Sequence, residues 1–222
     1  MPPKAKYTRE EIVQIALDFV AARGMEALNA RNLAAALGTS TRPLFTAFKN
    51  MGELIEEIHF AAMKRFEEYA KKTGEDTPAF KSVGMQMILF AAEQPKLFQM
   101  LFMSEEGTQI RAWDSSAPAG SFEEMFDGLG KTRRLCMEYI MRDYGLNENE
   151  ARLLFRSTWL FTFGICALIA SGVCSYDEKE VSQMLSTEFR SVMGLILSGK
   201  AFEELKYQKE LSPQEFKEQF GK

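Results

Sequence analysis

The chain has 222 residues, of which 46% are hydrophobic, so it can bury a sizeable core and is not disordered as a whole. Its 18 Phe and 13 Met residues, together with few β-branched runs, favour packed helices over sheets. The net charge of −4 is unevenly distributed, because residues 1–50 hold seven basic and four acidic side chains while the remainder is net acidic. Only the N-terminal part is therefore electrostatically suited to bind phosphates.

The cysteine residues and the hydropathy of the sequence indicate in which cellular compartment the protein is expected. Cys136, Cys166 and Cys174 form no CxxC motif and are odd in number, which favours apolar residues in a reducing compartment over a disulfide framework. Residues 1–6 lack the apolar core of a signal peptide. Residues 157–176 form an uncharged stretch of 20 residues, about a membrane span, but seven Ser, Thr and Gly residues dilute its apolarity. We interpret it as a buried helix and expect a cytoplasmic protein without a membrane span.

Three helices are predicted within the first fifty residues. Thr8 and Glu11 form a capping box that opens the first helix, and Gly24 ends it. Its apolar residues follow the spacing of a core-facing stripe, at Ile12, Ile15, Ala16, Phe19 and Val20. A short second helix is expected over about 30–37 and a third over about 41–47.

The turn between the two short helices consists of Gly38, Thr39 and Ser40. Glycine permits a tight turn, and Thr39, Ser40 and Thr41 are candidate N-caps for the third helix. If Ser40 is the cap, Pro43 falls in the first turn, where its missing N–H costs little. Two short helices in this arrangement, braced by a preceding amphipathic helix, are typical of a helix-turn-helix.

Every later segment is also predicted to be helical. A longer helix runs from just after Asn50 to about Thr73. Further helices are expected near 78–93, 95–104, 121–144, 148–173, 177–199 and 200–209. The main loop is expected at 105–120, which is rich in Gly, Ser, Ala and Pro. The fold class predicted is therefore all-α.

The turn and the third helix resemble the signature of a known family. The run from Leu33 to Asn50, LAAALGTSTRPLFTAFKN, followed by Glu53-Leu54, is similar to the I-A-x-x-x-G-V-S-x-x-x-[LI]-Y-x-[HY]-F-x-[SN]-x-x-[ED]-L pattern of TetR/AcrR regulators. Further along, residues 92–98 resemble the H-P-x-L-F segment of that family, and residues 159–164 its W-x-x-x-H-G segment. The sequence departs from the pattern at three positions, where Val, Tyr and His are usual: Thr39, Phe45 and Phe163.

The resemblance implies a three-helix DNA-binding domain at residues 1–50 and a larger helical domain for effector binding and dimerisation at residues 51–222. At the matching positions, the implied DNA-binding residues are Asn29, Arg31, Thr39, Ser40, Thr41, Arg42, Pro43, Phe45, Thr46 and Lys49. Arg42 is the candidate for a base edge, because a guanidinium can bind guanine O6 and N7 together. Asn29, Arg31 and Lys49 would hold phosphates. An isolated Arg or Lys is more often a solvated charge; within this motif we favour DNA contact.

Aromatic and methionine side chains concentrate between the end of the fourth predicted helix and the uncharged stretch. They either line an apolar cavity or fill a core, and the resemblance implies a ligand pocket among these helices. The candidate ligand-binding residues are Phe98, Phe102, Met103, Trp113, Phe122, Met125, Phe126, Met137, Phe155 and Trp159. Because few charges are interspersed, the expected effector is a flat or flexible apolar molecule.

A second apolar feature predicts a subunit interface. The segment 177–199 carries a stripe formed by Val181, Leu185, Phe189, Val192 and Ile196, and it is widened by Met184, Met193 and Leu197. With the uncharged stretch, this is more apolar surface than one small domain needs to bury. A four-helix bundle formed by two subunits would cover it, and an intrachain core is the alternative.

The function implied by the resemblance is transcriptional regulation, in which a homodimer binds a near-palindromic operator in double-stranded DNA and releases it when a small effector binds. An enzyme and an interaction scaffold are the rival interpretations. Residues 128–132 end like a P-loop, but Met125 stands where its first glycine is required. His59 is the only histidine, so a zinc site with two histidines is excluded. We predict no catalytic residue, metal or cofactor, and a scaffold leaves the motif unexplained.

Overall fold

The computed structural model describes residues 7–72, 78–103, 129–199 and 213–220. Within these ranges the secondary structure is helical and contains no strand. The all-α prediction is therefore confirmed. Predicted elements at 105–120, 121–128 and 200–209 lie outside the described residues.

The N-terminal unit has the helix layout that the sequence predicts. It consists of α1 (Arg9–Arg23), the 3-10 turn η1 (Met25–Ala27), α2 (Ala30–Ala36) and α3 (Arg42–Ala47). The capping box of α1 is present, since the Thr8 hydroxyl accepts from the Glu11 N–H at 3.2 Å and the Glu11 carboxylate accepts from the Thr8 N–H at 2.7 Å. Gly38, with a φ of 61°, makes the turn between α2 and α3.

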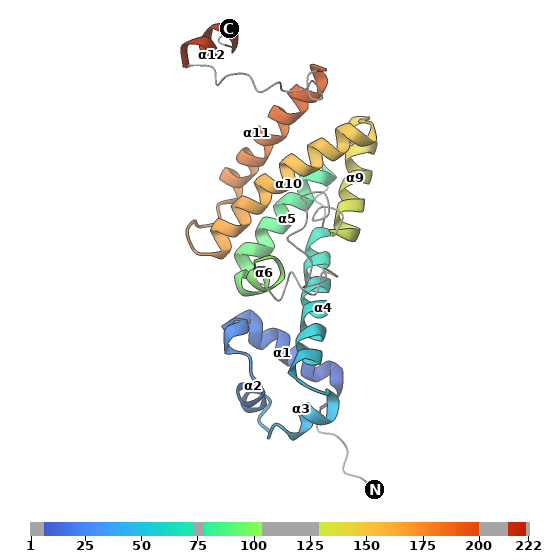
Figure 1. The fold of residues 1–222 in the computed structure, drawn as a ribbon, viewed down its shortest axis with the longest axis vertical. Coiled ribbons are helices and arrows are strands. Elements are labelled where there is room, and N and C mark those ends of the chain that lie inside the picture. The colour runs from blue at the N-terminus through green and yellow to red at the C-terminus, as the bar shows by residue number, and fades with distance from the viewer. Residues whose placement is uncertain (1–6, 73–77, 104–128, 200–212, 221–222) are drawn as a thin grey trace.

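A long helix leads from this unit into the larger helical domain (Figure 1). The remaining helices are α4 (Met51–Ala70), α5 (Ala79–Glu93), α6 (Pro95–Phe102), α9 (Gly130–Tyr144), α10 (Glu148–Ala170), α11 (Glu178–Leu197) and α12 (Pro213–Phe220). Helix α12 was not predicted, because the sequence was interpreted as helical only up to about residue 209. The others agree with the predicted ranges to within a few residues over the part that the structure describes.

Helix α10 occupies the centre of the larger domain, with α5, α9 and α11 packed against it (Figure 1). By length and composition alone it could cross a membrane. In the structure it buries Leu154, Phe155, Ile165 and Cys166 against its neighbours. This side of α10 packs as a core helix does, as predicted for the uncharged stretch, whereas Leu160 and Leu168 on the helix are exposed.

One hydrophobic core runs from the N-terminal unit into the larger domain. Its buried members include Ile12 of α1, Leu44 of α3, Ile58 of α4, Phe98 of α6 and Cys166 of α10. A second core lies mainly between α9 and α10 and includes residues of α5 and α11. The first core is thus continuous across residue 50, so the helices on either side of that position bury their apolar faces together.

Arg9 ties α1 to the end of α3 and the start of α4. Its guanidinium donates to the Ala47 carbonyl at 2.7 Å and to the carboxylates of Glu53 and Glu57 at 2.9 and 2.8 Å. The same group lies 4.3 Å from the centroid of the Phe48 ring. The hydrogen bonds to Glu57 and Glu53 raise the pKa of Arg9, so the side chain stays charged.

Helix α6 connects α1 with α10. Helix α6 packs directly against α1, and Lys96 Nζ lies 3.7 Å from the carboxylate of Glu26. At its other side, the Gln99 side-chain amide donates to the carbonyl of Ala170, the last residue of α10, at 2.7 Å. Helix α6 is therefore in direct contact with both α1 and α10.

Glu53→Gln should lower the thermal midpoint at neutral pH and lose this effect in acid. The Lys49 backbone N–H, followed by Arg9, holds the pKa of Glu53 below its ordinary value of 4.5. The contribution of the charged carboxylate is therefore complete above 4.5 and is lost as the pH falls through the lower folded-state pKa. Thermal denaturation from neutral pH to about pH 3 tests this.

The control is Glu56→Gln, at an exposed position of the same helix. It should change the midpoint little at neutral pH. A Glu53→Gln difference that persists undiminished at the lowest pH would contradict the ion-pair account.

Candidate nucleic-acid interface and internal cavity

Helices α2 and α3 lie at the end of the molecule, far from α10 and α11 (Figure 1). They are only seven and six residues long, so packing has to hold them. Leu33 of α2 and Leu44 of α3 supply that packing, since both are buried in the first core. The rest of each helix surface is left for solvent or a partner.

The predicted phosphate and base contacts are exposed on this end. Arg31, Arg42 and Lys49 are all exposed, and none forms an ion pair within the ranges that the structure describes. The Lys49 backbone N–H, by contrast, is held by Glu53 at 2.6 Å. Asn29 is exposed and its side chain caps α2, accepting from the Asn32 N–H at 2.9 Å. Three cations are thus left available at the surface around α2 and α3.

The turn residues that precede α3 are divided between solvent and packing. Ser40 is exposed, whereas Thr39 and Thr41 are half-buried. Thr41 is the N-cap residue of α3, and no side chain caps the helix there. Of the three candidate N-caps, Thr41 therefore occupies the N-cap position without capping the helix through its hydroxyl, and α3 begins at Arg42.

Within α3, adjacent residues point in different directions. Leu44 is 1% exposed and packs inward, while Phe45 is 51% exposed and presents an apolar ring to solvent. Pro43 is half-buried in the first turn, as predicted. The Thr46 hydroxyl is committed to its own helix, donating to the Arg42 carbonyl at 2.9 Å.

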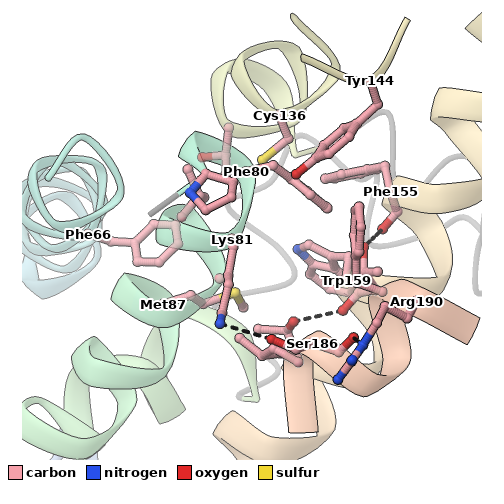
Figure 2. Close-up of a pocket in the computed structure, with 18 residues that line it drawn as sticks. Phe66, Phe80, Lys81, Met87, Cys136, Tyr144, Phe155, Trp159, Ser186 and Arg190 are labelled. Carbon is pink, nitrogen blue, oxygen red and sulfur yellow. Dashed lines mark hydrogen bonds between the residues drawn. The ribbon is translucent and has the colours of Figure 1, made fainter. Parts of the chain in front are cut away.

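A cavity of about 420 Å³ lies in the larger domain (Figure 2). Helices α5, α9, α10 and α11 form its walls, and Phe66 of α4 closes one side. Its size falls within the range of small-molecule sites. The cavity therefore could hold a compact ligand.

Two of the predicted ligand-binding residues, Phe155 and Trp159, line this cavity (Figure 2). Phe98 and Phe102 lie instead in the first core, with their ring centroids 4.8 Å apart. Phe102 also packs edge-on against Phe66 at 5.1 Å. The structure thus separates a cavity group from a core group that sequence reasoning had placed together.

The other predicted ligand-binding residues lie elsewhere. Met103, at the end of α6, is 45% exposed, and Met137 packs on the second core; the cavity wall includes neither. Four further candidates fall outside the described residues: Trp113, Phe122, Met125 and Phe126.

The polar side chains of the cavity were not predicted. Lys81, Ser186 and Arg190 line it together with the aromatic residues (Figure 2). Lys81 is the only charged residue of α5 apart from Glu93 at its C-terminal end. That isolated charge in an otherwise apolar helix was the available signal.

Burial sets the protonation of two other cavity residues. It raises the pKa of Cys136 to about 12 and also raises the pKa of Tyr144. Both groups stay protonated at neutral pH. Cys136 is therefore an apolar wall residue and no nucleophile, while the Tyr144 hydroxyl can donate a hydrogen bond.

The stripe expected at a subunit interface is packed within the subunit. Its members Val181, Leu185, Val192 and Ile196 are buried in the two cores, and Phe189 lines the cavity. For these five residues the prediction of a subunit interface was wrong, because the periodicity identifies a covered face but not the chain that covers it. Of the residues that widen the stripe, Met184 and Leu197 are exposed, and so are Leu160 and Leu168 of α10 and Leu195 of α11.

Comparisons with solved structures identify the fold. A protein assigned to the TetR family of transcriptional regulators, from Mesorhizobium loti, matches with a TM-score of 0.54 at 14% identity, over 84% of this chain and 95% of its own. The fold is that of a TetR-family regulator. The chain also aligns with SCO0253, a TetR-family regulator from Streptomyces coelicolor (TM-score 0.40, 21% identity, 87% and 95% of the two chains), and with Mycobacterium smegmatis AmtR (0.38, 16%, 87% and 98%).

No family model matches the sequence, and a comparison with curated proteins also gives no match. The identification of the TetR-type fold therefore rests on the Mesorhizobium loti structure, since the other two TM-scores are below 0.5. The helix-turn-helix unit followed by a helical domain agrees with the fold class predicted from the motif.

Phe98→Ala should lower the free energy of unfolding by about 3–5 kcal/mol, because it removes a fully buried ring from the first core. Met103→Ala is the matched control at the end of the same helix; its exposed side chain should change stability by no more than about 0.5 kcal/mol. Urea denaturation measures both. A loss below about 1 kcal/mol for Phe98→Ala would show that this ring is not part of a packed core.

Proposed function

We propose that the protein is a DNA-binding transcriptional regulator, a repressor that binds a near-palindromic operator as a homodimer and leaves it when a small, largely apolar effector occupies the cavity. The observation that carries the proposal is the exposed cluster of Arg31, Arg42 and Lys49 around α2 and α3 of a TetR-type fold. A positively charged helix-turn-helix surface is suited to phosphates and to the major groove.

The roles within this surface follow from side-chain chemistry. We assign Arg42, in the first turn of α3, to a base edge, because its guanidinium can bind guanine through two hydrogen bonds. We assign Arg31 and Lys49 to phosphates. Phe45, which has no hydroxyl, would contact a thymine methyl or the sugar edge through its exposed ring.

A dimer would place two α3 helices in successive major grooves. We propose that the exposed apolar residues of α10 and α11 form its interface. Leu160, Gly164 and Leu168 recur four residues apart on α10, and all three are exposed. No atom lies within 4 Å of the position that a Cβ of Gly164 would take, so another helix has room to approach there. On α11, Leu195 is equally exposed.

Effector release requires that a ligand favour one arrangement of the helices over another. The cavity walls include α10, the end of α10 is hydrogen-bonded to α6, and α6 packs on α1. Arg9 then joins α1 to the end of α3. A ligand that shifts α10 would thereby change the angle at which α3 meets the groove.

Arg42→Ala should weaken binding to the specific operator by about 1–3 kcal/mol and relax sequence preference at one position. Lys49→Ala should weaken binding to operator and random DNA alike and reduce the salt dependence by about one phosphate. Gel-shift titrations against the DNA upstream of the gene itself, at several salt concentrations, measure both. Lys179→Ala, at an exposed position of α11, is the control.

An equal loss of specificity in the Arg42 and Lys49 variants would contradict this division of roles. If both variants bound operator DNA as tightly as the wild-type protein, the proposal that α3 lies in the DNA interface would be wrong.

Leu168→Glu should convert the proposed dimer to monomers, because it places a charge within the proposed apolar interface. Phe60→Glu is the matched control, since Phe60 is a 68% exposed apolar residue on α4. Analytical ultracentrifugation measures the oligomeric state of each variant. A Leu168→Glu protein that remains dimeric at the wild-type concentration dependence would assign the interface to another face.

A further inference from the structure

The cavity of the larger domain contains two cationic side chains. Lys81 of α5 and Arg190 of α11 both line it, and no Asp or Glu is among the described residues of its wall. Arg190 is exposed to solvent, whereas Lys81 is half-buried, so a purely apolar ligand would leave the Lys81 ammonium without a counter-charge. The charge pattern of the wall therefore carries information about the ligand.

Lys81 is held in place by neutral partners. Its ammonium donates to the hydroxyls of Ser182 and Ser186 at 2.7 and 2.9 Å. The Ser186 hydroxyl donates in turn to the Ser182 carbonyl at 2.9 Å, so it meets the ammonium with an oxygen lone pair. An ammonium has three N–H donors, and these contacts use two of them. Within the described residues no carboxylate lies within ion-pair distance of this half-buried charge.

Arg190 lies next to the same serine. Its Nε donates to the Ser186 carbonyl at 3.1 Å, which fixes the guanidinium beside the cavity and leaves its two terminal nitrogens for other acceptors. In Figure 2, Lys81, Ser186 and Arg190 gather on one side of the cavity, whereas Phe80, Cys136 and Phe155 lie on the other.

The remainder of the wall carries no charge and is mostly apolar, with the Tyr144 hydroxyl and Thr132 as its further polar groups. Phe66, Met87 and Trp159 contribute apolar surface. The hydroxyls of Thr158 and Thr162 are already used, donating to carbonyls one turn earlier in α10 at 2.6 and 2.7 Å. The charged groups of the described wall are thus concentrated at the Lys81 end, and the mostly apolar opposite side favours hydrocarbon.

We propose that the cavity binds an amphiphilic monocarboxylate, with the carboxylate held by Lys81 and Arg190 and the hydrocarbon body packed against the aromatic wall. A carboxylate supplies the acceptor for the third ammonium N–H and for the guanidinium fork, and it offsets the cost of burying Lys81. The inference rests on the proposed function only in that it gives the chemical class of the effector.

The test is calorimetric titration of the full-length protein, without DNA, using octanoate, decanoate and dodecanoate, with decanol as the neutral match of decanoate. Wild-type protein should bind decanoate at least about tenfold more tightly than decanol, because a hydrogen-bonded charge pair is worth that much in a partly buried site. Lys81→Met, which keeps an unbranched apolar stem, should abolish this preference while retaining decanol binding. Lys179→Met, at an exposed position outside the cavity, should behave as wild type.

The proposal is overturned if none of the three carboxylates binds, if wild-type protein does not prefer decanoate over decanol, or if Lys81→Met keeps the preference. Lys81→Gln provides a second neutral variant should the first fail to fold. DNA release is assayed separately by gel shift. Lys81-dependent carboxylate binding without any effect on DNA binding would retain this inference and contradict the effector role. Release of DNA by decanol but not by decanoate would retain the effector role of the cavity and contradict a carboxylate as the effector.

Discussion

The shared hydrophobic core across residue 50 is the constraint on which the rest of the structure depends. Helices α2 and α3 are too short to be stable in isolation, so they exist because Leu33 and Leu44 are buried against their neighbours. Arg9 also helps to fix the relative orientation of these helices, because its hydrogen bonds and ion pairs join α1 to the end of α3 and to α4. The orientation of the proposed recognition helix is consequently set by helices that also pack on the larger domain.

The same continuity gives the cavity a physical route to the other end of the molecule. Helix α10 contributes cavity wall at Phe155 and Trp159, and its last carbonyl accepts the hydrogen bond from Gln99 of α6. Packed interiors shift in discrete steps and do not deform smoothly, so a ligand that repositions α10 would select between arrangements of α6 and α1. We propose that residues 1–50 bind DNA and that residues 51–222 bind the effector and form the dimer. These two functions can be separate even though the helices on either side of residue 50 share one hydrophobic core.

Local features were predictable from the sequence, and non-local packing was not. The capping box at Thr8 and the turn at Gly38 each depend on a few adjacent residues. The N-terminal helices and the family resemblance could therefore be predicted from the amino-acid sequence. The α11 stripe was assigned to a partner because periodicity reports a buried face without naming what covers it. The cavity combines side chains from five helices, and its cationic end depends on Lys81, which belongs to a segment that the aromatic composition had not singled out.

Amide hydrogen exchange under native conditions tests the central claim, that the proposed DNA-binding helices and the cavity helices form one packed unit. Val20 of α1 and Cys166 of α10 are both buried in the first core, so we expect their amides to be among the slowest to exchange in each helix. The account predicts that they exchange through openings whose free energies agree to within about 1 kcal/mol. Exchange of the α1 amides through an opening several kcal/mol less costly than that of the α10 amides would show that the N-terminal unit unfolds alone, and would contradict the account.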